Sequence, residues 1–185
     1  GAGNVANGVN SLYSNTTGDG NTAIGSNTLF SNTTGYDNTA IGGGAMNSKT
    51  TGIRNTAIGK DALYFDTVGI YNVALGYRAL FLNTQGSRHT AVGSWALYYN
   101  TTGQSNSAFG YDALKANTTG GYNTANGYAA LNLNTTGSYN TAIGFNADVT
   151  AVNLTNATAI GYNALVSSSN KIRLGDTNVT SIEGQ

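Results

Sequence analysis

The side chains that could carry acid–base or metal chemistry are few in this sequence. The 185 residues include one histidine, no cysteine and eight carboxylates. A histidine or thiolate metal site needs several such ligands around one ion, and a nucleophile needs a base beside it. One histidine, His89, supports neither arrangement within a chain. We therefore expect no enzyme, no metal site and no cofactor.

These scattered groups belong to a tandem repeat of 17 residues. Ten copies occupy residues 4–173 without insertion, with the consensus N-T-A-I-G-x-x-A-L-x-x-N-T-T-G-x-x, here numbered as repeat positions 1–17. A unit this short suits a β-solenoid coil rather than a helical repeat. We predict an all-β, parallel β-solenoid with strands at "TAIG" and "xALxx" and a turn at "NTTG", where Gly is free to adopt a positive φ. Ten coils spaced by about 4.8 Å form a rod roughly 50 Å long.

The places of the histidine and the carboxylates in the repeat favour structural roles for them. His89 takes position 1, where other copies have Asn, so we expect a turn residue. The alternative is a metal held by three His89 side chains near the axis of a trimer. Asp61 and Asp112 share position 7 but lie three coils apart, about 14 Å by the coil spacing. That separation is too large for the paired carboxylates of a glycosidase.

Two apolar columns are predicted to face each other inside the roll. The position-9 column is Leu12, Leu29, Met46, Leu63, Leu80, Leu97, Leu114, Leu131 and Leu165, and the position-4 column is Ile24, Ile41, Ile58, Leu75, Val92, Phe109, Ile143 and Ile160. Asn7 and Asn126 replace the apolar residue at position 4. Because buried amides need partners, these two are predicted either to form polar core layers that hold water or an anion, or to mark a locally widened, solvated coil.

Aromatic side chains recur at two further positions. They are Tyr77, Tyr111, Tyr128, Phe145 and Tyr162 at position 6, and Tyr13, Phe30, Tyr64, Phe81 and Tyr98 at position 10. With Ala at position 8 they are predicted to form one apolar stripe, larger than soluble monomers usually expose. The stripe is interpreted as a subunit interface or as an exposed ligand face. At position 17, Tyr71, Tyr122 and Tyr139 either stack on sugar rings or cover turns.

The Asn-x-Ala-apolar-Gly motif, repeated ten times, resembles the YadA-type head repeats of trimeric autotransporter adhesins and related fibre proteins of phage tails and injection systems. The resemblance covers residues 4–173 and implies a left-handed parallel β-roll in a side-by-side homotrimer. Head repeats in that family are commonly shorter, and the long "xxNTTGxx" turn is a departure. Residues 1–173 are thus predicted to be the repeat domain, and residues 174–185 an exit segment leading to a further C-terminal region, where related fibres often carry a chaperone domain.

The expected function is that of a non-catalytic fibre or adhesin head segment, extracellular on a cell surface or on a virion or injection-system fibre. Its expected partners are two further copies of the chain and a cell-surface receptor, with a glycan as the preferred class. A formal net charge of zero gives no footprint for nucleic acid, and no apolar run is long enough to insert into a membrane. The alternative is an ice-binding or other ligand-binding solenoid that uses Thr columns, such as position 13 from Thr16 to Thr135.

Overall fold

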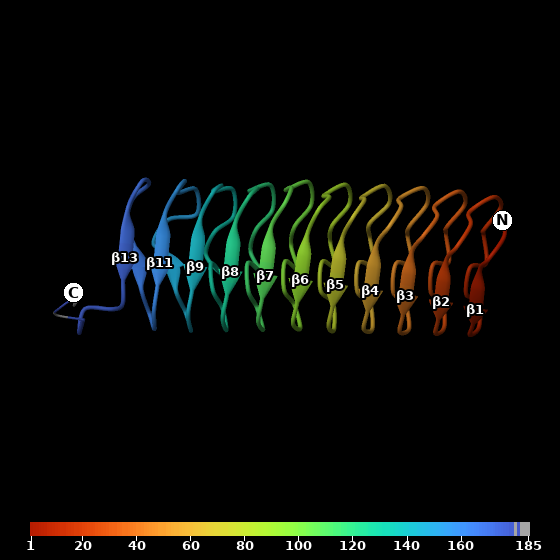
Figure 1. Ribbon diagram of the computed structural model, residues 1–185, viewed down its shortest axis with the longest axis horizontal. Helices are drawn as coiled ribbons and strands as arrows, with labels where there is room; N and C mark the ends of the chain where they lie inside the picture. The colour runs from red at the N-terminus through yellow and green to blue at the C-terminus, as the bar shows by residue number, and fades with distance from the viewer. Residues whose placement is uncertain (180, 182–185) are drawn as a thin grey trace.

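The computed structural model describes residues 1–179 and 181, and it confirms the all-β, parallel solenoid with coils of 17 residues. Figure 1 shows the coils side by side along the long axis, with β1 near one end and β13 near the other. In the described residues the strands are β1 (Val5–Asn7), β2 (Thr22–Ile24), β3 (Thr39–Ile41), β4 (Thr56–Ile58), β5 (Val73–Leu75), β6 (Thr90–Val92), β7 (Ser107–Phe109), β8 (Thr124–Asn126), β9 (Thr141–Ile143), β10 (Asp148–Val149), β11 (Thr158–Ile160), β12 (Leu165–Val166) and β13 (Ile172–Leu174).

One parallel sheet runs the length of the rod. Its strand order is β1-β2-β3-β4-β5-β6-β7-β8-β9-β11-β13 among the described residues. From β1 to β11, each residue of a strand pairs with the residue 17 positions later in the next strand, as Ala23 does with Ala40. The last step is shorter: Ala159 pairs with Arg173, 14 residues on. The sheet therefore continues across residue 173, while the 17-residue period ends before β13.

The strands turn the middle of "TAI" inward, which corrects one predicted core column. Ala at position 3 is buried from Ala23 to Ala159, whereas position 4 points outward, with Ile58 41% and Ile143 42% exposed. Side chains alternate across a strand, so only one of these two positions can face the core. Ala is the one that faces the core, because the Ala and Leu side chains of the opposite wall already fill the narrow space between the two walls.

The same correction applies to Asn7 and Asn126. Both amides lie on the outer face of the sheet, exposed to solvent, and neither forms a polar core layer. Position 4 is outward in these coils as in the others. No widening of the roll is therefore needed to accommodate them.

The wall opposite the sheet is not the predicted second strand in the first eight copies. Positions 7 and 9 have left-handed backbone there, as in Asn27 (φ 56°) and Leu29 (φ 49°). The chain consequently folds as successive turns. These turns still form hydrogen bonds to the next coil, as when Leu29 N–H donates to Ala45 O at 3.1 Å. Two consecutive buried side chains, Ala at position 8 and Leu at position 9, result from this geometry.

Extended backbone replaces these turns in copies nine and ten, where β10 and β12 pair with each other. Position 10 now faces inward, with Val149 and Val166 buried, whereas position 9 differs between the two copies: Leu165 is half exposed and Asp148 is buried. The wall thus changes from turns to strands, and its large buried apolar side chain moves from position 9 to position 10. The position-9 column is buried as predicted from Leu29 to Leu131, and each such side chain contributes about 1.5–3 kcal/mol.

Two ladders of buried amides stabilise the edge beside the "NTTG" turn. At position 1, Asn38 N–H donates to Asn21 Oδ1 at 3.0 Å, and its Nδ2 donates to Gly52 O at 2.9 Å. At position 12, Asn117 Nδ2 donates to Asn100 Oδ1 at 2.8 Å. The repeat keeps Asn at both positions because a buried amide is satisfied by an identical amide one coil away.

Candidate functional site

The solenoid presents two long outer faces. The sheet face carries repeat positions 2 and 4 of the main sheet, and the turn face carries positions 7, 10 and 11 of the opposite wall. The aromatic residues at position 6 lie just after the Gly of position 5, which ends each strand with a positive φ, for example 131° at Gly93. In the part of the chain that the structure describes, no helix is long and apolar enough to cross a membrane.

The sheet face is apolar along most of its length, and the sequence interpretation placed these side chains in the core. Its exposed position-4 residues include Ile24, Ile58, Phe109, Ile143 and Ile160. Thr and Val stand beside them at position 2, partly exposed. The result is a row of apolar side chains over strands β2 to β9 and β11, interrupted once by the amide of Asn126.

The predicted aromatic stripe divides into two ladders, because the Ala residues at position 8 are fully buried in the core. The position-6 ladder stacks Tyr111, Tyr128, Phe145 and Tyr162 with ring centroids 5.0–5.7 Å apart. The position-10 ladder stacks Tyr13 on Phe30 at 5.2 Å and places Phe81 between Tyr64 and Tyr98 at 5.5 and 5.2 Å. One-coil spacing favours such offset stacking.

Trp95 joins the two ladders. Position 6 of its coil is Ser94, so the position-6 ladder lacks a ring there. The indole at position 7 fills the gap, 6.4 Å from Tyr77 and 5.7 Å from Tyr111, and also lies 6.5 Å from Tyr98 of the other ladder. This is the chain's single tryptophan.

Two ion pairs border the rings around Trp95. Lys115 Nζ lies 4.3 Å from the indole centroid and 3.0 Å from Asp112 Oδ1. Arg78 Nε lies 3.3 Å from Asp61 Oδ2, with its guanidinium carbon 5.0 Å from the Tyr77 ring. A pocket of about 140 Å³ opens here on the turn face, lined by Arg78, Trp95, Tyr98, Tyr99 and Lys115.

The tyrosines at position 17 lie in exposed turns and share a positive φ of 58–61°. Tyr122 and Tyr139 stack at 5.1 Å with nearly parallel rings. Tyr71 instead accepts a hydrogen bond from Arg54 Nη1 at 2.9 Å. Both sugar stacking and turn covering are compatible with these positions.

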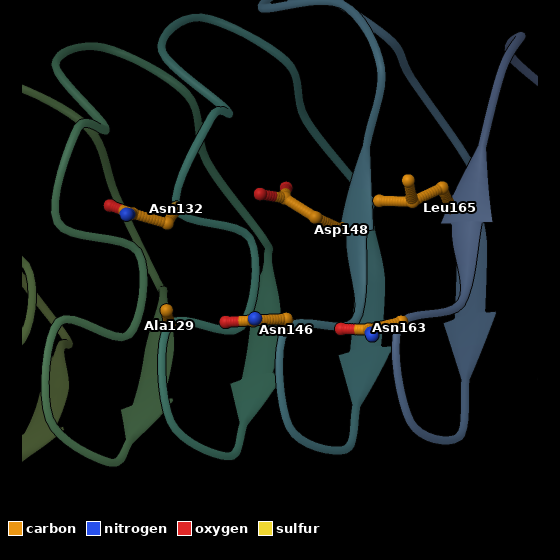
Figure 2. A pocket seen from close by; sticks show the side chains of 6 residues that line it. All are labelled: Ala129, Asn132, Asn146, Asp148, Asn163 and Leu165. Atoms are coloured by element: carbon orange, nitrogen blue, oxygen red, sulfur yellow. The ribbon is translucent and has the colours of Figure 1, made fainter. Parts of the chain in front are cut away.

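A second pocket lies where the wall changes from turns to strands (Figure 2). It has a volume of about 330 Å³ and is lined by Ala129, Asn132, Asn146, Asp148, Asn163 and Leu165. Figure 2 shows Asn146 and Asn163 in one row with Ala129, and Asp148 and Leu165 in a second row with Asn132.

Asp148 is the ionisable group of this second pocket. The residue is 6% exposed, and its carboxylate accepts the Val149 N–H at 2.7 Å and the Leu133 N–H at 3.0 Å. Burial raises the pKa of Asp148 to about 6, although the backbone donors favour the charged form. Within residues 1–179 and 181, no cluster of three His, Cys, Asp or Glu side chains surrounds a common point.

His89 is a buried member of the position-1 ladder. Its Nδ1 accepts the Asn106 N–H at 3.1 Å, as an Asn Oδ1 does, and its Nε2–H donates to Gly103 O at 2.8 Å, as an Asn Nδ2 does. Burial lowers the pKa of His89 to about 4, because the imidazolium would lose its hydration. The neutral imidazole is thus a substitute for asparagine, with both ring nitrogens already engaged.

The position-12 ladder contains a buried ion pair that the sequence interpretation missed. Lys49 and Asp66 occupy position 12 in adjacent coils, both fully buried, and Lys49 Nζ donates to Asp66 Oδ2 and to Gly69 O. Asn32, one coil before Lys49, is left with an Oδ1 that has no hydrogen-bond partner among the described residues. The lysine directs its ammonium away from that oxygen.

The Thr column at position 13 uses its hydroxyls within the solenoid. Each Oγ1 from Thr16 to Thr135 donates to the carbonyl of position 13 in the next coil at 2.9–3.2 Å. These hydroxyls therefore help to hold adjacent coils together. They are not free donors on a flat surface.

Sequence reasoning missed Trp95, Tyr99 and Lys115 as a group, because they come from different repeat positions and two coils. One available signal was the single tryptophan at a position that is otherwise small, polar or charged. A second was the occurrence of Lys49 and Asp66, opposite in charge, exactly one period apart at an Asn position. In the comparisons with known proteins, no family model, curated protein or solved structure matches this chain.

Proposed function

We propose that this chain is a non-catalytic segment of a homotrimeric extracellular fibre that projects from a cell, virion or injection system and binds a cell-surface glycan. The observation that carries the proposal is the sheet face. Its position-4 row from Ile24 to Ile160 is apolar except at Asn126 and is two-fifths exposed at several coils, and soluble chains seldom leave so long an apolar surface in contact with water.

A second and a third copy of the same chain are the partners that fit this face. The apolar side chains recur once per coil at the parallel strand spacing of about 4.8 Å. Only a partner with the same axial repeat stays in register along the whole row, and an identical chain has it. A trimer assembled through the sheet face agrees with the resemblance to trimeric adhesin head repeats, and it leaves the turn face, with its aromatic ladders, open for a receptor.

The mass of the protein in solution tests the assembly. Light scattering is expected to give about three times the 18.9 kDa of one chain. The double variant Ile58→Glu/Ile143→Glu is expected to dissociate it, because it places charges in the apolar row. Tyr139→Glu, an exposed residue outside the sheet face, is the matched control and is expected to leave the mass unchanged. A monomeric wild-type chain would refute the trimer.

Glycan binding has its own test. The wild-type protein, applied to an immobilised glycan array, is expected to bind a subset of saccharides through aromatic side chains on its surface. An array without any bound saccharide would refute the receptor part of the proposal and leave the fibre as a spacer.

The sheet face also supports a second candidate, an ice-binding solenoid. Thr22, Thr39 and Thr56 stand in register at position 2 of three adjacent strands, beside the Ile row. These Thr hydroxyls lie on a regular sheet, unlike those of position 13. A monomer with measurable thermal hysteresis would favour this candidate, whereas a trimer without hysteresis would exclude it.

A further inference from the structure

We infer that the pocket around Trp95 binds one neutral pyranose ring of a glycan. This inference rests on the proposed glycan-binding function and assigns it to a place on the turn face. The aromatic walls of the pocket are Trp95, Tyr98 and Tyr99, and its polar rim is formed by Arg78 and Lys115. Aromatic faces pack against the apolar face of a sugar, and the charged rim can bond its hydroxyls.

The residue type at Trp95 is the first observation. Trp95 has φ 62°, in the left-handed region that position 7 adopts in all coils, where the other copies have Asn, Asp, Gly, Arg or Ala. Leu or Met at position 9 has the same left-handed backbone in the first eight copies, so this φ belongs to the scaffold. Trp95 differs from the other nine copies in placing an aromatic side chain at position 7.

The packing around the indole of Trp95 is the second observation. Trp95 and Tyr98 make a T-shaped contact, and Tyr98 and Tyr99 make another at 4.7 Å, so the rings present walls at steep angles to one another. Tyr99 is 46% exposed. The indole Nε1–H is shielded from water and has no hydrogen-bond partner among the described residues, so this donor is still unsatisfied in the described structure.

The charges of the rim decide the class of sugar. Arg78 is paired with Asp61, and Lys115 with Asp112. The rim therefore has donors and acceptors but no net charge, which suits the vicinal hydroxyls of a neutral sugar better than a carboxylate. A volume of about 140 Å³ is below that of usual drug-sized pockets and accommodates a single ring.

The single tryptophan makes the test direct, because its fluorescence reports on this pocket alone. Intact protein is titrated with lactose, maltose and cellobiose as neutral probes and with sialyllactose as an acidic one. We expect a saturable change in tryptophan emission with at least one neutral disaccharide and a Kd on the order of 1 mM, typical of a small ligand with few contacts.

Two variants locate the binding. Tyr99→Ala removes a largely exposed wall of the pocket, and it is expected to raise the Kd by about fivefold or more. Tyr36→Ala is the matched control, since it removes an exposed tyrosine (38%) that lies outside both aromatic ladders and four coils away, and its Kd is expected to stay within about twofold of wild type. Circular dichroism verifies that both variants are folded.

Several outcomes overturn the inference. If emission responds to sialyllactose alone, the neutral-sugar assignment is wrong. If Tyr99→Ala and Tyr36→Ala both bind as wild type does, the pocket is not the site. If emission never changes while the glycan array shows binding, the receptor function stands and its site lies elsewhere. If the array is also blank, the glycan-binding function itself has failed.

Discussion

Replacing Lys49 and Asp66 with asparagine, singly and together, tests how the buried ladder holds adjacent coils. Both side chains are fully buried, and Lys49 Nζ donates to the carboxylate of Asp66. Burial lowers the pKa of Lys49 and raises the pKa of Asp66, while each partner's charge partly offsets the effect on the other. Formation of the ion pair thus requires the desolvation of two charged groups, which opposes folding.

Each single variant leaves one buried charge without its counter-ion. Breaking a buried pair in this way costs about 3–5 kcal/mol. In Lys49→Asn, the new Nδ2 can reach back to the orphaned Asn32 Oδ1 and offset part of that loss. In Asp66→Asn, the ammonium keeps only Gly69 O as a partner. We therefore expect Asp66→Asn to be the more destabilising of the two.

The double variant restores the consensus ladder. Asn at 49 donates to Asn32 Oδ1, and Asn at 66 donates to the new amide at 49 and still accepts from Asn83 Nδ2, as Asp66 does at 3.2 Å. Satisfying the orphaned oxygen is worth about 1–3 kcal/mol, and removing two buried charges is neutral or favourable. The double variant is therefore expected to be at least as stable as wild type.

Urea titrations followed by circular dichroism measure the four proteins, with m-values compared because long repeat arrays can lose two-state behaviour. We expect strong non-additivity, with two destabilising single substitutions that compensate each other in the double variant. Single variants that each lose less than about 1 kcal/mol, or a double variant that is less stable than either single one, would refute it.

The remaining predictions concern pH and packing. The folded pKa of His89 is about 4 against about 6.5 in unfolded chains, so its stabilising effect is complete above pH 6.5. As pH falls from 6.5 to 4, roughly 3 kcal/mol of stability relative to His89→Asn is lost, and urea titrations of both proteins across that range should show it; parallel pH profiles would contradict it. Asp148 has the opposite sign, because its folded pKa is about 6: its contribution is present below about pH 3.9 and lost as pH rises through 6, again roughly 3 kcal/mol. The stability of Asp148→Asn should lack this slope, and an unchanged slope would rule the assignment out. Leu80→Ala, in the core, is expected to cost about 2–5 kcal/mol, whereas Leu133→Ala, which is 52% exposed, should change stability by less than about 0.5 kcal/mol; thermal and urea unfolding would detect equal losses, which would disprove the assignment of the core.

The sequence was sufficient for the architecture because a solenoid repeats its physical requirements once per coil. An invariant 17-residue period implies stacked coils in register, and the Leu column was identified as core because it is large and apolar in eight successive copies. Asn at positions 1 and 12 is explained by the same logic, since an amide ladder needs an identical partner in each coil. Those inferences depend only on repetition.

The direction of the side chains in each coil depended on the tertiary structure. In a three-residue strand, alternation allows either Ala or Ile to face inward, and Ile appeared the better core residue. The choice is set by the narrow space between the walls, which consecutive Ala and Leu of the turn wall already fill. That packing follows from Leu29 and its equivalents taking a left-handed backbone, which no propensity for leucine indicates.

The candidate site likewise depends on contacts between side chains of neighbouring coils. Sequence periodicity identified the two aromatic columns, and most of their members do stack on the surface. It could not show that Trp95, one position out of column, fills the gap at Ser94 and joins the columns beside Arg78 and Lys115. The repeated residues thus determined the scaffold from the sequence alone. The role of residues that depart from the repeat depends on which side chains of neighbouring coils they contact, and only the tertiary structure shows those contacts.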